Sequence, residues 1–381
     1  MGTGEGAGRR EGREDGGVDA RDNTHIGQVR VDEGPYARIA GLPLTVEDYG
    51  CERLERDVSS GFRRVTTVVV LRGSGHEGRG EDVTYAAADH DPYPLALPLR
   101  GQTTLDGFSQ LIGGLDLFPD RPPESDTYRN YRRWAFESAA LDLALRQQGK
   151  SFGAALDHDY HPVRFAVSTR LDVMPWLAVN PELEFKLDPT PEWDGGTIAR
   201  VAATGRVRVL DFKAFYHGSP VDNPPDAAQY RAVAAAFPDA ILEDPALEGP
   251  ARAALDGEEA RFSFDAPIHS WADVEALPEH PRFLNIKPSR FGSLSALLDC
   301  VDRALAEGIV LYGGGQFELG VGRAQIQALA SLLYPYGPND VAPIDYHGEA
   351  HAGVPRSPLE PLTQAPGFGF SFKRGAGAAS H

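Results

Sequence analysis

Short apolar runs alternate with helical stretches along the second half of the chain. From residue 164 onward the runs are rich in β-branched and aromatic residues, and this alternation is typical of parallel β/α units. The pattern predicts eight strands, at residues 163–167, 183–187, 207–212, 240–242, 261–264, 283–286, 309–312 and 341–344. Eight strands joined by crossover helices favour a closed β/α barrel, whose site lies at the carboxyl ends of the strands.

One helix between these strands has clear signals at both ends. Ser293 is a residue type that caps helices, apolar residues at spacings of three and four run from Leu294 to Leu305, and Gly308 is suited to end the helix. The Asn339–Asp340 pair, just before the eighth apolar run, instead indicates a turn.

The first half of the chain has a mixed pattern that predicts an α+β domain. The run at 64–72 is typical of a strand, the Gly-rich stretch at 73–81 of a turn, and residues 82–85 of a returning strand. Apolar spacing predicts a helix over 131–148, which Gly149 is suited to end.

These patterns divide the chain into four segments. Residues 1–27 hold almost no apolar side chain, so they cannot bury enough surface to offset the entropy of ordering, and we expect a disordered tail. We expect the α+β domain at 28–150, the barrel at 151–350, and a C-terminal segment at 351–381 that partly returns to the α+β domain.

Composition narrows the class of partner. The chain has 381 residues, 41% of them hydrophobic, which is enough for a packed core. The formal charge of −18 argues against nucleic acid, whose binding depends on clustered Lys and Arg. Cys51 and Cys300 are too few for a disulfide framework or a zinc site, and no apolar stretch approaches the length of a membrane span. We therefore expect a cytoplasmic protein with no membrane partner.

Lysine is rare in this chain, and its positions are informative. Only five of the 37 basic residues are Lys, and three of them, Lys186, Lys213 and Lys287, close predicted strands of the barrel. Arginine stays protonated at any workable pH, whereas a buried ammonium can be driven to lose its proton. These three lysines are therefore the candidates for catalysis.

Charged residues also end the neighbouring strands. The groups at the ends of the second to sixth strands are Lys186 and Asp188, Asp211 and Lys213, Glu243 and Asp244, Asp265, and Lys287. Three acids brought together at a barrel mouth repel unless a cation lies among them, and carboxylate oxygens suit Mg²⁺ or Mn²⁺. We therefore expect Asp211, Glu243 and Asp265 to bind a divalent metal ion. The alternative is a structural ion-pair network of these acids with Lys213 and Arg290.

Five further residues are candidates for binding the substrate or supporting the site: Glu318, Arg290, Asp188, Asp244 and Gln316. Arg290 is suited to clamp a carboxylate or to brace a loop. Glu318 either orients the substrate or Lys287, or it braces its own loop. Asp244 either caps a backbone segment or faces solvent.

Five short motifs in the barrel half carry a family resemblance. They are Leu-Asp-Phe-Lys at 210–213, Leu-Glu-Asp-Pro at 242–245, Phe-Asp-Ala-Pro at 264–267, Asn-Ile-Lys-Pro-Ser-Arg at 285–290 and Gly-Gly-Gln-Phe-Glu-Leu-Gly-Val-Gly-Arg at 314–323. In this succession the chain resembles the enolase superfamily, in the branch of muconate lactonizing enzyme, succinylbenzoate synthase and dipeptide epimerase. The stretch at 133–156 is also similar to the family's helix that links cap to barrel, and the stretch at 68–81 is similar to a strand and turn of its capping domain, so the resemblance covers roughly residues 30–350. It implies that the α+β domain at 28–150 caps a modified TIM-type β/α barrel. In a capped barrel, loops of the cap close over the mouth and select the substrate, and we expect residues 39–49 to do so here.

The resemblance implies a chemistry and a partner. Members of this superfamily use Mg²⁺ and a Lys or His base to remove the proton beside a carboxylate through an enediolate. By motif match, Asp211, Glu243 and Asp265 take the metal roles and Lys287 the base role. The implied substrate is a small carboxylate, the implied reaction is of racemase, epimerase or cycloisomerase type, and relatives usually form homo-oligomers. The alternatives are a sugar-acid dehydratase and a non-catalytic relative that binds a small acid.

The chain departs from the family pattern on two strands, which makes it an atypical member. The family's second strand usually ends Lys-x-Lys, whereas this chain keeps only Lys186, so either Asp188 replaces the second Lys or Glu184 replaces the first. The family's third strand usually ends Asp-x-Asn, whereas this chain has Lys213 in place of the amide. Lys213 either takes over the role of the missing Lys, which we favour, or pairs with Asp211 and Glu243 and displaces the metal.

Overall fold

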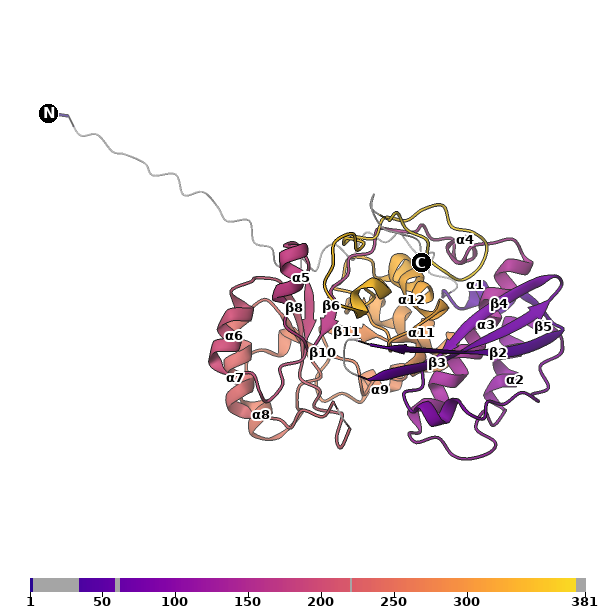
Figure 1. The fold of residues 1–381 in the computed structure, drawn as a ribbon, viewed down its shortest axis with the longest axis horizontal. Coiled ribbons are helices and arrows are strands. Elements are labelled where there is room, and N and C mark those ends of the chain that lie inside the picture. Colours follow the sequence, from indigo (N-terminus) through magenta and orange to yellow (C-terminus); the bar gives the residue numbers. More distant parts are fainter. Residues whose placement is uncertain (3–33, 59–61, 220, 375–381) are drawn as a thin grey trace.

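The computed structural model describes residues 1–2, 34–58, 62–219 and 221–374. The chain folds as an N-terminal α+β cap beside a C-terminal curled parallel sheet, as Figure 1 shows. The tail expected at 1–27 lies, except for its first two residues, outside the described residues.

The cap is built on antiparallel strands that pack against one long helix. Strands β2 (Asp48–Asp57), β3 (Arg63–Gly73) and β4 (His76–Asp82) form one sheet, and β1 (Pro43–Val46) pairs with β5 (Gly101–Thr104). The helical segments are α1 (Ala37–Ala40), η2 (Ala87–His90), α2 (Leu105–Gly113) and α3 (Thr127–Gln147). The strand expected at 64–72 and the helix expected at 131–148 are both present, as β3 and α3.

The returning strand of this sheet begins earlier than expected. The turn is only Ser74 and Gly75, both with positive φ (51° and 75°), and β4 starts at His76 inside the stretch expected to be a turn. Gly78 and Gly80 lie in β4 because α3 packs directly on them. A Cβ at Gly78 would lie 2.4 Å from the carbonyl oxygen of Ala139, so only glycine allows this approach.

Residues 39–49 do not close over the barrel mouth. They form α1, β1 and the start of β2, the backbone N–H of Thr45 donates to Oε1 of Gln147 at 3.0 Å, and Tyr49 donates to the carbonyl of Pro94. This segment is held inside the cap because β1 pairs with β5. Other parts of the cap, at Phe62 and Tyr85, contact the barrel loop instead.

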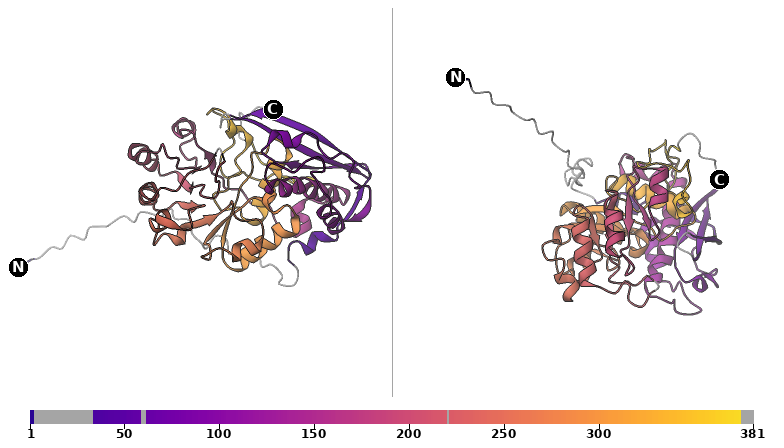
Figure 2. Two further views of the ribbon diagram at one scale, coloured as in Figure 1. Left: turned by 90° about the horizontal axis from the view of Figure 1, so that it is seen from below. Right: turned by 60° about the vertical axis from the view of Figure 1, so that its left-hand side comes forward.

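The second half of the chain forms a curled sheet of seven parallel strands. In sheet order they are β6 (Val167–Thr169), β7 (Phe185–Leu187), β8 (Val207–Asp211), β9 (Ile241–Glu243), β10 (Phe262–Phe264), β11 (Phe283–Ile286) and β12 (Val310–Gly313). The covering segments are α5 (Met174–Val179), α6 (Gly195–Ala202), α7 (Ala227–Ala236), α8 (Gly249–Ala253), η3 (Glu259–Arg261), α9 (Trp271–Glu275), α10 (Pro288–Phe291), α11 (Leu294–Ala306) and α12 (Val321–Leu333). Helices α6 to α8 lie on the side away from the cap and α11 and α12 on the side facing it (Figures 1 and 2). Ser293 caps α11 as expected, since its hydroxyl accepts the N–H of Ala296.

The eighth strand, expected at 341–344, does not form. Pro343 has no N–H to donate to a ladder, and the 3₁₀ helix η4 (Ile344–His347) follows it. The ring is closed instead by two isolated parallel bridges, from Asn339 to Phe165 and from Asp340 to Gly314. Asn339 is fully buried, and its amide bonds the backbone N–H of Gly313 and the carbonyl of Arg164, so it joins the two edges of the sheet rather than making a simple turn.

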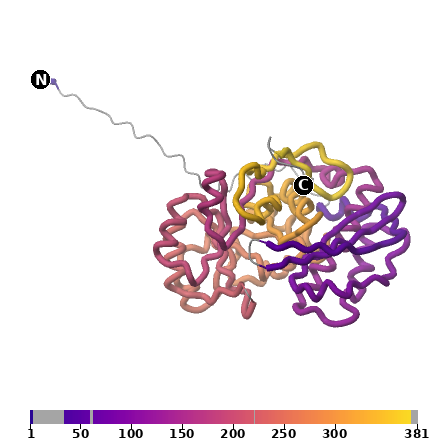
Figure 3. The backbone as a smooth tube through the Cα atoms, viewed as in Figure 1, coloured from indigo at the N-terminus to yellow at the C-terminus, as the bar shows by residue number. Residues whose placement is uncertain are grey.

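The C-terminal segment crosses from the barrel to the cap side of the molecule (Figure 3). The N–H of Phe368 donates to Oδ1 of Asp142 on α3, and its ring packs against Phe152 of α4 (Phe152–Leu156) with centroids 4.9 Å apart. Gly367 forms a bridge with Ser151. None of the helices in the described parts of the chain has the length and apolar content needed to cross a membrane.

Hydrogen bonds from the cap hold the strand-end loops of the barrel. The buried carboxylate of Glu81, on β4, accepts the backbone N–H groups of Leu319, Gly320 and Gly322 at the start of α12. On α3, the amide of Asn130 donates to the carbonyl of Arg290 at 2.7 Å. The cap therefore holds the loops that follow β11 and β12.

Candidate active site at the barrel mouth

Three carboxylates from successive strands meet at the mouth. Asp211 ends β8, Glu243 ends β9, and Asp265 follows β10, and all three are fully buried. One oxygen from each lies within 4.8 Å of the others. On one Mg²⁺ at about 2.1 Å, adjacent oxygens lie roughly 3 Å apart and opposed oxygens roughly 4.2 Å apart, so these acids need only a small inward movement to share an ion. The cluster is therefore of the size and chemistry that a hard divalent cation requires.

Lys186 lies beneath this cluster. Its ammonium contacts Oε1 of Glu243 and lies 3.1 Å from Oδ2 of Asp211, and its side chain is 1% exposed. Burial alone would lower the pKa of Lys186, but the two carboxylates raise it well above its usual range. Lys186 is thus a fixed cation that balances the charge of two of the three acids.

Lys213 reaches the same acid from the end of β8. Its ammonium contacts Oδ2 of Asp211, and its backbone has the left-handed φ of 57°, which is unfavourable for a residue with a side chain. Burial opposes the charged form, but Asp188 and Asp211 raise the pKa of Lys213 above its usual range. Conversely, burial opposes ionisation of Asp211, and the Lys213 and Lys186 ammoniums hold its pKa well below the usual range.

Asp265 is held by donors from two other strand-end loops. Lys287 lies 2.7 Å from Oδ2, the guanidinium of Arg290 lies 3.0 Å from Oδ1, and the hydroxyl of Tyr216 donates to Oδ2 at 3.3 Å. Burial raises the pKa of Asp265, but Arg290 and Lys287 outweigh it and hold the pKa well below the usual range. Arg290 also donates to the Tyr216 hydroxyl at 2.8 Å, so it braces this acid and its loop.

Glu243 is surrounded by donors inside the barrel. The Asn285 amide donates to both of its oxygens at 3.2 Å, the Tyr312 hydroxyl donates to Oε2, and Ser263 bonds Tyr312 at 2.9 Å. Burial raises the pKa of Glu243 well above its usual range, with Lys186 acting against the rise and Asp211 adding to it. Sequence patterns did not single out Asn285 or Tyr312 as site residues, because inward-facing polar residues on short strands have no signal beyond alternation.

Asp244 points to the neighbouring strand rather than to solvent. Its carboxylate accepts the N–H of Asp265 at 2.8 Å and the N–H of Ala266 at 3.0 Å. It is fully buried, and burial together with the charge of Asp265 raises its pKa to about 7. Asp244 therefore caps the end of β10 and orients Asp265.

The two acids considered as lysine replacements occupy different environments. Glu184 is paired with Arg164 and Arg208 and makes no ion pair with the acid cluster. Asp188 is buried, pairs with Arg170 at 2.7 Å, and acts electrostatically on Lys213. The geometry therefore favours Lys186 as the first lysine of the family pattern and Asp188 as the residue in place of the second.

Glu318 and Gln316 lie in the loop between β12 and α12. Oε1 of Glu318 accepts the N–H of Gln316, and Oε2 pairs with Arg323 at 3.1 Å, so Glu318 braces its own loop. Gln316 is held by the cap, since Tyr85 donates to its side-chain Oε1 and its side-chain Nε2 donates to the hydroxyl of Tyr131, both at 3.0 Å. Neither residue contacts the three acids through a hydrogen bond or ion pair found in the described parts of the chain.

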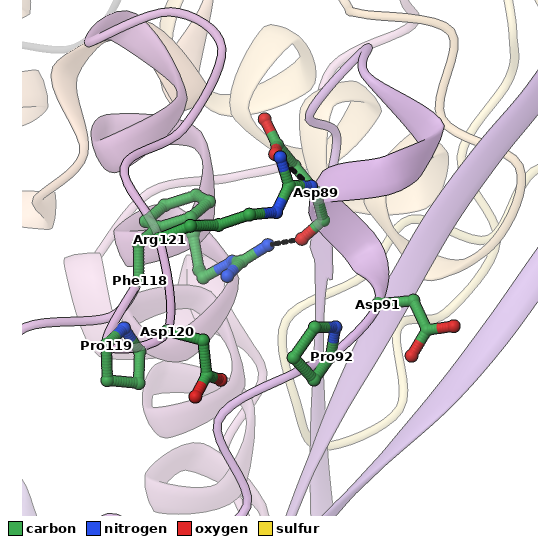
Figure 4. Close-up of a pocket in the computed structure, with 8 residues that line it drawn as sticks. Asp89, Asp91, Pro92, Phe118, Pro119, Asp120 and Arg121 are labelled. Atoms are coloured by element: carbon green, nitrogen blue, oxygen red, sulfur yellow. Dashed lines mark hydrogen bonds and ion pairs between the residues drawn. The ribbon is translucent and has the colours of Figure 1, made fainter.

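Two cavities lie away from the acid cluster. One in the cap, between Asp89 and Phe118, has a volume of about 10 Å³ and is bordered by the ion pair of Arg121 with Asp89 at 2.8 Å (Figure 4). That volume is barely enough for one water molecule. The other, about 130 Å³, lies between the loop after β6 and helix α6, with Arg170, Trp193 and Arg200 among its walls.

The donor set fits a divalent metal ion, with one condition. Three carboxylate oxygens at this spacing are ligands that Mg²⁺ and Mn²⁺ accept. The ammoniums of Lys186 and Lys213 touch the same oxygens, so an ion that binds Asp211 and Glu243 must displace one or both. The same condition applies to Asp265, because Lys287 and Arg290 already contact its two oxygens.

Comparisons with known proteins place the fold. Two family models match, the N-terminal domain of the domain of unknown function DUF8230 at residues 37–155 and its C-terminal domain at 159–348. No match was found among curated proteins.

Solved structures match over most of the chain. A member of the enolase superfamily from Listeria innocua is 18% identical, covering 86% of this chain and 95% of its own, with a TM-score of 0.60. Muconate cycloisomerase from Pseudomonas fluorescens is 18% identical, and the match covers 87% of this chain and 97% of that chain, with a TM-score of 0.60. A dipeptide epimerase from Methylococcus capsulatus, complexed with Mg ion, is 19% identical. The match covers 87% of this chain and 100% of that chain, with a TM-score of 0.60. These likenesses confirm the expected cap and barrel architecture.

Proposed function

The chain belongs to the DUF8230 family and has the fold of the enolase superfamily, and from this premise we propose that it is an Mg²⁺- or Mn²⁺-dependent enzyme that removes the proton beside a substrate carboxylate. One observation carries the proposal. Acids at the ends of β8, β9 and β10 bring three oxygens within 4.8 Å, with Lys213 and Lys287 at either flank. In an enolase-type barrel this arrangement serves carbon-acid chemistry.

Each residue has a role that follows from its position. Asp211, Glu243 and Asp265 would hold the ion, and a bound dication would offset the negative charge that develops on the substrate carboxylate. Lys287 Nζ takes the proton from the carbon beside that carboxylate, leaving an enediolate. Lys186 is buried against two of the acids and keeps the charge of the site balanced rather than moving a proton.

The reaction type depends on Lys213. If Lys213 Nζ reaches the opposite face of the same carbon, it returns a proton there, and the product is the epimer or the opposite enantiomer. If Lys213 only balances Asp211 and Asp188, the enediolate instead loses or adds a group at the neighbouring carbon, as in a cycloisomerase. The enzyme is thus of isomerase or lyase type.

Metal binding is the first test. Mg²⁺ titrated into the chelator-treated protein in a calorimeter should bind saturably to wild type and not to Asp265→Asn. Asp273→Asn, an acid in α9 that is not part of the cluster, is the matched control and should bind as wild type does. Carboxylic acids should then exchange their α-proton for deuterium in wild type and not in Lys287→Met. Absence of saturable binding in wild type would contradict the metal-dependent mechanism.

A second function is favoured by one observation. Lys186 and Lys213 already neutralise Asp211 and Glu243, which suits a relative that binds a small acid without a metal and without chemistry. That protein would bind carboxylates equally well in chelator and in Mg²⁺ and would exchange no α-proton.

A further inference from the structure

Three aromatic side chains lie where the cap contacts the loop after β12. Phe62 and Tyr85 come from the cap and Phe317 from the loop after β12, and together they are called the aromatic rim here. Phe62 and Tyr85 each expose 38% of their surface, and the rings of Phe62 and Phe317 make an edge contact with centroids 5.8 Å apart. Strands β2 and β3 extend from the cap towards the barrel (Figure 3). Neighbouring exposed aromatic side chains are typical of a binding surface.

Two polar contacts hold the Tyr85 ring. Its hydroxyl donates to Oε1 of Gln316 at 3.0 Å, and the guanidinium of Arg64 stacks on one face with its carbon 4.4 Å from the ring centroid. Together they fix the orientation of the ring against the loop after β12.

Phe317 is held in a strained backbone conformation. Its φ is 56°, in the left-handed region that residues with side chains avoid. The fully buried Arg64 stabilises this turn, donating to the carbonyl of Gln316 at 3.0 Å and approaching that of Phe317 at 3.4 Å. Strain of this kind persists where the surroundings enforce it, and it is concentrated at ligand sites.

The same loop also packs on a proposed catalytic residue. A Cβ at Gly314 would lie 2.9 Å from Cε of Lys287, so the loop that carries Phe317 begins in contact with that lysine. The aromatic rim is thus continuous with the acid cluster through a few residues of one loop.

From this arrangement we propose that the aromatic rim binds an apolar or aromatic group of the substrate. The inference rests on the proposed function and names its substrate class: carboxylates that carry a phenyl-sized or similar apolar group a few bonds from the reacting carbon. The carboxylate lies at the acid cluster, the apolar group packs against Tyr85 and Phe317, and Phe62 covers it from the cap.

Binding of two simple acids tests the proposal. The probes are 3-phenylpropionate and propionate, titrated with Mg²⁺ present and followed by calorimetry. Burial of a phenyl group should make 3-phenylpropionate bind at least about tenfold more tightly than propionate. Phe317→Gly, which suits the positive φ, and Phe62→Ala, which removes no side-chain hydrogen bond, should each abolish most of this preference.

Tyr336→Ala is the matched control. Tyr336 also exposes 38% of its surface, but it lies in the loop after α12, where its carbonyl accepts from Arg164 at the amino ends of the strands. This variant should keep the full preference. Equal affinity for the two acids in wild type, or no binding of 3-phenylpropionate, would overturn the aromatic subsite.

The same titrations separate the two proposals. Saturable Mg²⁺ binding with no preference between the acids would leave the proposed function intact and remove the subsite. A preference that depends on Phe317 and Phe62, found without Mg²⁺ binding or α-proton exchange, would support the subsite and remove the metal-dependent reaction.

Discussion

The carboxylate of Asp244 accepts the backbone N–H of Asp265 at 2.8 Å, so the end of one strand fixes the acid on the next. A second bond from the N–H of Ala266 at 3.0 Å completes this cap. The acid cluster therefore depends on a fourth carboxylate that itself points to the backbone. The adjacent acids Glu243 and Asp244 at the end of β9 thus differ, since Glu243 belongs to the acid cluster and Asp244 supports the backbone of the next strand.

Replacement of Asp244 should affect both folding and metal binding. Asp244→Ala leaves two buried N–H groups without a partner, which should lower the free energy of unfolding by roughly 2–4 kcal/mol. It should also weaken Mg²⁺ binding, because Asp265 loses its orientation. Urea unfolding and calorimetry measure the two effects, and unchanged values in both would show that Asp244 has no such role.

Replacement of Lys186 should lower the free energy of unfolding mainly when no metal ion is present. Lys186→Met removes the ammonium shared by Asp211 and Glu243. Removing one partner of a buried ion pair destabilises a protein by about 3–5 kcal/mol, because the other charge stays buried without a partner. Mg²⁺ should recover part of this loss, since the ion supplies the missing positive charge. Urea unfolding in chelator and in Mg²⁺ tests this, with the exposed Lys150→Met as control. An equal loss in both conditions would argue against a shared site for the ion and the ammonium.

The left-handed backbone at Lys213 can be tested by two substitutions that both remove the ammonium. Lys213→Gly should be more stable than Lys213→Ala by about 1 kcal/mol, because glycine adopts a φ of 57° without steric cost. Urea midpoints of the two variants give the difference directly. A more stable Ala variant would show that the loop changes conformation when the lysine is removed.

The contact of β4 with α3 should tolerate no added methyl group. In Gly78→Ala, the new Cβ would meet backbone atoms of Leu143 and Ala139 at 2.3 and 2.4 Å, so we expect a loss of roughly 2–4 kcal/mol or failure to fold. Gly195→Ala, where the added Cβ meets nothing within 4 Å, should be neutral or slightly stabilising. Thermal unfolding of the two variants is the measurement, and equal melting temperatures would contradict the packing described.

His347 should make the protein sensitive to mild acid. Burial and the nearby Arg323 lower its pKa to about 3 in the folded state, whereas an unfolded histidine titrates near 6.5. Since the folded pKa is depressed, the stability is fully present above pH 6.5 and is lost as the pH falls from about 6.5 towards 3. Between pH 7.5 and 5, His347→Gln should therefore lose less stability than wild type, by on the order of 1–2 kcal/mol. The exposed His351→Gln should behave as wild type does, and a parallel loss in all three proteins would exclude His347 as the cause.

Local signals explain which parts of the fold were predictable from sequence. The alternation of apolar runs, the capping Ser293 and the charged strand ends are local, and β7 to β12 begin and end within a few residues of the expected positions. The cluster of Asp211, Glu243 and Asp265 follows from the same logic, because parallel strands bring their carboxyl ends to one edge.

The features that the sequence did not predict depend on contacts between distant parts of the chain. Closure of the barrel by Asn339 in place of an eighth strand requires partners at Phe165 and Gly313 that no local pattern reveals. The early start of β4 is visible only once α3 packs on its glycines. The donors around Glu243, and the left-handed φ of Lys213, are likewise set by the assembled barrel. The role of each lysine and the homo-oligomeric state remain predictions.

The carboxylate of Glu81 has a consequence for how the protein is made. It is buried in the cap, yet its hydrogen-bond partners are the N–H groups of Leu319, Gly320 and Gly322, more than two hundred residues later. During synthesis the cap sequence leaves the ribosome long before these partners exist. Until then Glu81 must stay in water or take up a proton, because burying an unpartnered carboxylate is costly. The cap therefore reaches its final form only after the barrel, so the first-made half of the chain is among the last to be completed.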